Sequence, residues 1–114
     1  MRTNLALISP PKTYLRVSYR KASEGENDID YLLTRVLKHD DYLAFEKLYR
    51  LNYNSLRTFC KKLVVINEVA EELVSEVFLK IWNNRGRIVI SSSPKSYLYA
   101  AVRNISFDHL RKEK

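Results

Sequence analysis

The charged residues in the C-terminal half of this chain change sign along the sequence. Charges arranged in this way can bind partners of opposite charge. Between positions 68 and 80 four glutamates stand against one lysine: Glu68, Glu71, Glu72, Glu76 and Lys80. After Asn83 the excess is basic, with Arg85, Arg87, Lys95, Arg103, Arg111, Lys112 and Lys114 against Asp108 and Glu113. An acidic surface attracts a basic protein, whereas a basic surface attracts a polyanion, most often nucleic acid. The pattern predicts two different partners.

No set of residues predicts catalysis or metal binding. His39 and His109 lie seventy positions apart, and neither has neighbouring metal ligands in the sequence. Cys60 is the only cysteine, so the chain forms no internal disulfide and no cysteine-based zinc site. We therefore expect no enzyme activity, no metal and no cofactor.

The composition predicts a single small domain. The chain has 114 residues, of which 46% are hydrophobic, and a net charge of +7, which suits a nucleic-acid-binding protein. Only two glycines and three prolines occur, which favours long helices over a turn-rich β fold. The sequence predicts no signal peptide and contains no apolar run of membrane-spanning length, so we expect a cytoplasmic protein.

Helical spacing of apolar residues begins at Asp28, and the sequence predicts an all-α compact bundle of four to five helices for residues 28–114. Residues 1–27 show no sustained helical or strand periodicity and are predicted to be a mobile basic extension. Asp28 is expected to cap a first helix, Asp40 or Asp41 a second, and Asn67 the acidic helix. The second helix is expected to be interrupted between Asn52 and Ser55.

The last helix is expected to begin with Ser93 as its cap and Pro94 at its first position. Before it, residues 86–95 are predicted to be a loop, in which residues 88–90 could form one strand-like pass. This loop is rich in hydroxyl groups, which could line a pocket for an extruded base or be ordinary loop residues.

A helical wheel divides the acidic helix into two faces. The core stripe is predicted to hold Ala70, Leu73, Val74, Val77, Phe78 and Ile81, with Trp82 at its edge. The opposite arc holds Glu68, Glu72, Ser75, Glu76 and Leu79. This arc is either a solvated face or an apolar anchor ringed by carboxylates, which would suit a partner helix rich in arginine.

The last helix offers groups that could bind a nucleic acid. Arg103, Arg111 and Lys112 can neutralise phosphates. Tyr97 and Tyr99 could pack in the core or stack on unpaired bases. Asn104 has the paired donor and acceptor that read a base edge, but it could equally tie the helix to the loop.

Three runs together resemble one family. Residues 70–82, Ala-Glu-Glu-Leu-Val-Ser-Glu-Val-Phe-Leu-Lys-Ile-Trp, resemble the core-binding helix of bacterial RNA polymerase sigma factors of the sigma-70 family, and the nearest branch is the small extracytoplasmic-function type. Residues 44–49 are similar to that family's opening helix. Residues 96–104, followed by Asp108, Arg111 and Lys112, are similar to its promoter-recognition helix.

The resemblance implies a region 2 domain that binds the clamp helices of the polymerase's largest subunit and captures the non-template strand of the −10 promoter element. By resemblance the polymerase contacts are Glu72, Ser75, Glu76 and Leu79. The DNA contacts implied are Arg87, Ser92, Ser93, Lys95, Ser96, Tyr97, Arg103, Asn104, Arg111 and Lys112. An anti-sigma factor is an implied further partner, and the helix-turn-helix domain called region 4 is expected to be absent from this chain.

Two positions depart from the family pattern. Gln is usual where Ser75 stands, and Asp is usual where Glu72 stands, so the Ser75 side chain has a shorter hydrogen-bonding reach. Two alternative functions remain open at this point. They are a helix-turn-helix regulator of duplex DNA, and a helical bundle that binds only proteins.

Overall fold

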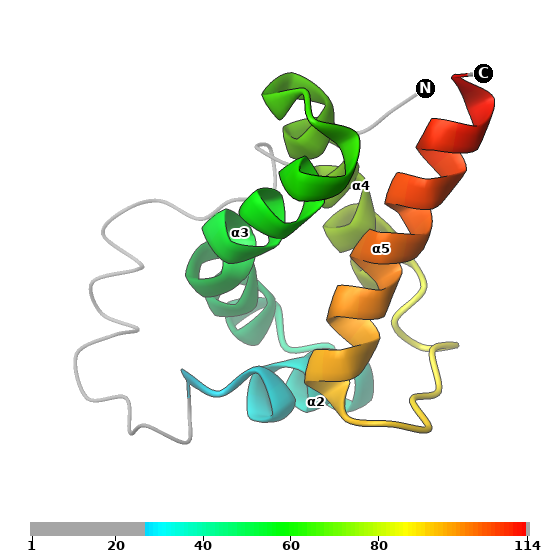
Figure 1. Cartoon of the computed structure of the whole chain (residues 1–114). Helices are drawn as coiled ribbons and strands as arrows, with labels where there is room; N and C mark the ends of the chain where they lie inside the picture. Colours follow the sequence, from blue (N-terminus) through cyan, green and yellow to red (C-terminus); the bar gives the residue numbers. More distant parts are fainter. Residues whose placement is uncertain (1–26, 114) are drawn as a thin grey trace.

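The computed structural model describes residues 27–113, and the remaining residues of the predicted N-terminal extension lie outside that range. Within it four helices follow one another: α2 (Ile29–His39), α3 (Tyr42–Val64), α4 (Asn67–Asn83) and α5 (Pro94–Lys112). No strand occurs among the described residues, so the strand-like pass at 88–90 is absent. The all-α prediction is confirmed, with α2 lying near the starts of α3 and α5 (Figure 1).

The predicted helix starts are correct at two positions. The Asp41 carboxylate accepts the backbone N–H of Ala44 at 3.1 Å, which caps α3. The Ser93 hydroxyl accepts the N–H of Ser96 at 3.0 Å, and Pro94 follows as the first residue of α5. Asp28 occupies the N-cap position of α2, but its side chain makes no capping hydrogen bond.

Two predictions about α3 and α4 are wrong. Ile66, not Asn67, is the N-cap residue of α4. The Asn67 side chain instead accepts a hydrogen bond from Arg57 at 2.8 Å and donates to Glu71, and these contacts tie the start of α4 to α3. The predicted interruption at residues 52–55 does not occur, and α3 is continuous there. The Asn52 side-chain amide donates a hydrogen bond to the backbone carbonyl of Leu48 in the same helix.

The core lies between the four helices, and α3 packs against each of the other three. The predicted α4 stripe is confirmed, since its buried residues are Ala70, Leu73, Val74, Val77, Phe78 and Ile81. The Phe45 ring packs against Phe78 and Trp82, with ring centroids 6.2 and 5.1 Å away. This aromatic group fixes α4 against the first half of α3.

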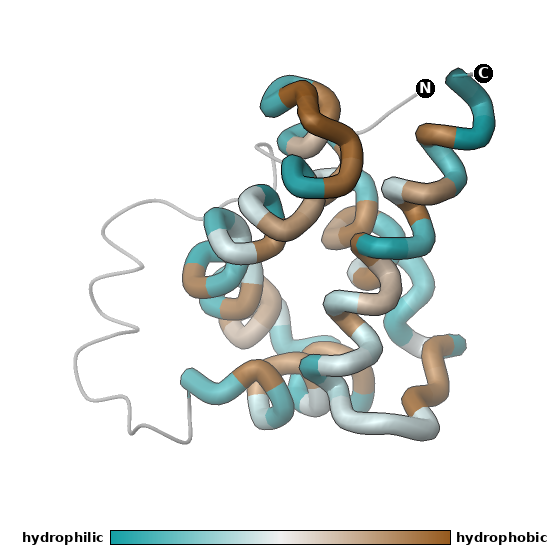
Figure 2. Tube along the Cα trace, viewed as in Figure 1, coloured by the Kyte–Doolittle hydropathy of each residue, from teal (hydrophilic) through white to brown (hydrophobic). Residues whose placement is uncertain are grey.

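The corner between α3 and α4 is tight and apolar. Val65 adopts φ 75° and ψ −44°, and the N–H of Ile66 donates to the carbonyl of Val64 at 2.8 Å, as in a γ-turn. Val65 is 73% exposed, and Figure 2 shows the hydrophobic colour at this end of the molecule. A β-branched residue at positive φ is strained.

Candidate functional site

Side chains of α3 and α4 meet along one side of the molecule in what we call the α3–α4 seam. It consists of Tyr42, Glu46, Tyr49, Tyr53, Ser75, Leu79 and Trp82. The rings of Tyr42 and Trp82 meet edge to face at 5.4 Å. The Ser75 side chain hydrogen-bonds the hydroxyls of Tyr49 and Tyr53. Leu79 lies one turn from both Ser75 and Trp82, so it shares their side of α4.

Glu46 is the one fully buried carboxylate in the described part of the chain. Its side chain is 2% exposed, and neither oxygen has a well-formed hydrogen bond to another described group. Burial raises the pKa of the carboxyl group, and the nearby Tyr42 hydroxyl and the charge of Arg50 lower it by less. An ionised carboxylate held in this way favours a cationic partner.

Carboxylates line the α4 side of the seam. Glu72 is exposed, while Ser75, Glu76 and Leu79 are half-buried. The structure therefore places the four predicted polymerase contacts on one side of α4. The Ser75 hydroxyl also interacts with two tyrosines, so it contributes to the packing of the seam. Its predicted contact with polymerase stays a prediction.

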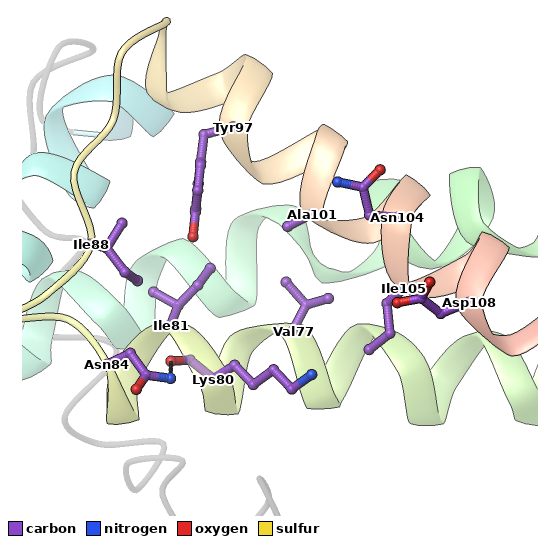
Figure 3. A pocket seen from close by; sticks show the side chains of 10 residues that line it. All are labelled: Val77, Lys80, Ile81, Asn84, Ile88, Tyr97, Ala101, Asn104, Ile105 and Asp108. Atoms are coloured by element: carbon purple, nitrogen blue, oxygen red, sulfur yellow. Dashed lines mark hydrogen bonds between the residues drawn. The ribbon is translucent and has the colours of Figure 1, made fainter.

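A groove lies between α4 and α5 on the other flank of α4. It has a volume of about 290 Å³, and its apolar floor is Val77, Ile81, Ile88, Ala101 and Ile105. Its polar lining comes from Lys80 and Asn84 on one side and from Tyr97, Asn104 and Asp108 on the other (Figure 3). This volume is near the lower end of small-molecule pockets, about 300–1,000 Å³.

The seam and the groove lie on opposite flanks of one helix. Ser75 lies on α4 and Asn84 is the C-cap residue that follows the helix. The nine residues between their positions amount to half a turn in direction at about 100° per residue. Lys80 faces the groove, whereas Leu79 faces the seam. A partner bound at the seam would therefore not overlap on α4 with a ligand bound in the groove.

Arg85 fixes the start of the loop that follows α4. Its guanidinium carbon lies 3.9 Å from the centre of the Trp82 ring, and its Nη1 donates to the Trp82 carbonyl at 2.6 Å. Its Nε pairs with Asp40 at 2.8 Å, which joins the loop to the corner between α2 and α3. Next to it, Arg87 donates to the Asn84 side chain.

The predicted DNA-binding residues do not all lie in one place. Tyr97 and Asn104 line the groove, where α5 brings them opposite Lys80. Ser93 caps α5, and its hydroxyl donates to the hydroxyl of Ser96. Ser92 lines a second cavity of about 410 Å³ between α2 and the loop. The backbone N–H of Lys95 donates to Asp30, which ties α5 to α2.

The remaining basic residues lie along the outside of α5. Arg103, Arg111 and Lys112 are exposed. Arg111 pairs with Asp108 one turn earlier, as an ordinary helix-surface pair would. Arg103 is closest in sequence to the groove residue Asn104, so phosphate binding there would place a base near the groove.

Sequence reasoning missed several residues of both surfaces. Lys80 and Asn84 line the groove. The sequence predicted the acidic helix, but it did not predict either residue as part of a binding site. On α3, Tyr42, Glu46, Tyr49 and Tyr53 follow one another at steps of four, three and four, which is the spacing of a single helix face. That spacing could have identified these four residues as one face of the helix.

Two kinds of site are absent from residues 27–113. No three of their His, Cys, Asp and Glu side chains are grouped so as to hold a metal ion. None of their helices has the length and apolar character needed to cross a membrane.

Comparison with known proteins identifies one family. Residues 48–114, more than half of the chain, match the family model for sigma-70 region 2. No curated protein and no solved structure matches the chain significantly. The matched range includes most of α3 and all of α4 and α5, the three helices that form the seam and the groove.

Proposed function

The chain belongs to the sigma-70 region 2 family, whose role is RNA polymerase binding and promoter recognition, and from this premise we propose how its two surfaces divide the work. The side of α4 next to the seam binds the clamp helices of the polymerase's largest subunit. The groove, with the basic face of α5, captures the melted non-template strand of the −10 element. The observation that carries this division is that seam and groove lie on opposite flanks of α4.

The polymerase surface is an apolar anchor inside an acidic rim. Leu79 supplies the anchor, and Glu72 and Glu76 supply the charge. The tyrosine hydroxyls that hold Ser75 keep this side of α4 in place. A basic, apolar helix is the complementary partner, since charge steers the approach and apolar burial at the centre provides most of the affinity.

DNA opening by this domain needs capture and no covalent chemistry. Extruding a base costs a few kcal/mol, and a pocket that binds the base offsets that cost. Tyr97 offers a ring at the groove wall, and stacking on an aromatic ring contributes about 1–3 kcal/mol per base. Asn104 can read the base edge, while Arg103, Arg111 and Lys112 hold phosphates.

The finer assignments are part of the same proposal. The order of motifs supports the extracytoplasmic-function type. We propose further that the domain acts in the cytoplasm, without enzyme activity and under control of an anti-sigma factor. The ten-residue connection from Asn84 to Ser93 supports this over a helix-turn-helix regulator, which needs a turn of three or four residues.

Copurification with core RNA polymerase tests the first surface. Leu79→Asp with Glu76→Lys should abolish binding, because it places a charge at the anchor and reverses one at the rim. The matched control is Leu110→Asp with Glu113→Lys, the same changes at the exposed end of α5. Both variants should keep the helical circular dichroism spectrum. Equal copurification of both variants would remove the interface assignment.

Binding of −10-like single-stranded DNA tests the second surface. Asn104→Ala should weaken binding by about 1–3 kcal/mol and relax base preference, as loss of a paired base contact does. Asn54→Ala, an exposed asparagine on α3, is the control and should leave affinity unchanged. Unaltered base preference in the Asn104 variant would exclude the groove as the reading site.

A further inference from the structure

The α3–α4 seam holds a buried carboxylate, that of Glu46, beside the Tyr42 hydroxyl and the charge of Arg50. Glu46 is buried, and no described group makes a well-formed hydrogen bond to its carboxylate. Tyr42 and Tyr49 flank it and are half-buried, so rotation of one tyrosine side chain would open the carboxylate to a ligand. A planar guanidinium, with five donors, is the side chain that fits such a carboxylate.

The surroundings of Glu46 favour a ligand that is both basic and aromatic. The seam contributes tyrosine rings, Leu79 and the edge of Trp82, while Glu71, Glu72 and Glu76 add negative charge beside it. Such a surface selects a segment in which cations alternate with apolar side chains.

The chain itself contains one such segment, outside the residues that the structure describes. Residues 12–21 read Lys-Thr-Tyr-Leu-Arg-Val-Ser-Tyr-Arg-Lys, with four cations and no carboxylate. Two of the cations, Arg16 and Arg20, are separated by Val17, Ser18 and Tyr19. The segment therefore matches the seam in charge and in apolar content.

The connection is long enough to bring this segment to the seam. Lys21 lies eight residues before Ile29, the first residue of α2, and eight residues can span about 26–29 Å when extended. Helix α2 has 11 residues, so it is about 16 Å long, and it ends next to Tyr42 at one end of the seam.

We propose that residues 12–21 bind the α3–α4 seam within the same molecule, with Arg16 or Arg20 paired to Glu46, and so compete with RNA polymerase for this side of α4. The competition, though not the binding itself, rests on the proposed function. A tethered segment has an effective concentration of about 1 mM, so a contact with a dissociation constant of about 0.1 mM would weaken polymerase binding by about tenfold.

The intramolecular contact can be tested without polymerase. Cys60 is fully buried, so a nitroxide on Ser18→Cys labels only the added thiol of the full chain. Amide NMR signals of residues 42–53 and 72–79 should broaden, those of 103–112 should not, and Glu46→Gln should reduce the effect. Absence of broadening at the seam overturns the proposal. So does equal broadening when labelled and isotope-enriched molecules are different copies, since the contact would then join two chains.

Competition is tested by the affinity of the full chain for core polymerase. Arg16→Glu with Arg20→Glu should tighten binding by about tenfold, since the tethered competitor no longer fits the acidic seam. The matched control is Lys61→Glu with Lys62→Glu, which changes the net charge equally at exposed positions of α3 and should alter affinity by less than about twofold. Equal affinities of the two variants would overturn the competition. Failure of every form to bind polymerase would instead refute the proposed function and leave the NMR result standing.

Discussion

Removing the Arg85 side chain should separate DNA binding from polymerase binding. Arg85→Ala deletes three contacts together: the stacking over Trp82, the hydrogen bond to the Trp82 carbonyl and the ion pair with Asp40. These contacts join the end of α4 to the α2–α3 corner and fix the loop before α5. Without them the loop should lose its fixed position. The seam should lose only the stacking on Trp82, whose ring keeps its contacts with Tyr42 and Phe45.

The contacts differ in strength. The charged hydrogen bond at 2.6 Å is half-buried and is worth about 1.5–3 kcal/mol. The cation–π contact adds about 0.5–1 kcal/mol. The ion pair adds less than about 1 kcal/mol, since the Asp40 side chain is 73% exposed. Because one side chain makes all three, we expect a net loss of about 2 kcal/mol, which lowers Tm by about 8–16 °C in a domain of this size.

Thermal unfolding and two binding assays measure the outcome. Arg87→Ala is the stability control, because the only described bond of its side chain is to the Asn84 side chain, and it should cost less than about 0.5 kcal/mol. Arg85→Ala should lower affinity for single-stranded −10-like DNA by about tenfold, because the loop must be ordered again on binding. Polymerase affinity should stay within about twofold. A stability loss below about 0.5 kcal/mol, or equal losses with both partners, would refute this reasoning.

Three further predictions concern single residues. Val65→Gly should raise Tm by a few degrees, since it relieves about 1–2 kcal/mol of strain at positive φ and loses little burial, and an unchanged or lower Tm would show that the corner is unstrained. Ser93→Ala should cost about 1 kcal/mol in urea unfolding, through loss of the α5 cap, and a change within error would exclude the cap. Burial raises the pKa of the Cys60 thiol, so the folded thiol keeps its proton where the unfolded one ionises, and stability should fall as pH rises above about 8.5. Cys60→Ala should remove this alkaline fall, and persistence of the fall would assign it to other groups.

Local patterns were enough to predict the helices and the core face of α4. The six buried residues of α4 repeat at helical spacing, and Asp41 and Ser93 cap helices through atoms three residues away. Asn67 shows where local reasoning fails. Its residue type and position are typical of an N-cap. Its side-chain oxygen instead accepts a hydrogen bond from Arg57, ten residues earlier. This contact forms only when α3 and α4 have packed together.

The two surfaces could be predicted only in part for the same reason. Lys80 and Asn104 face one groove although they are 24 residues apart, because α4 and α5 cross there. Glu46 is charged, yet packing of α3 on α4 buries it. Periodicity assigns a residue to a face of its own helix, and only packing decides which other helix that face meets.

The account depends on a domain that holds polymerase and an opened strand together. The most direct measurement is the affinity of the complex with core RNA polymerase for −10-like DNA, compared as a single strand and as the same duplex. We predict tighter binding of the single strand, with the preference reduced by Asn104→Ala. Tighter binding of the duplex, or no complex with polymerase at all, would contradict the account.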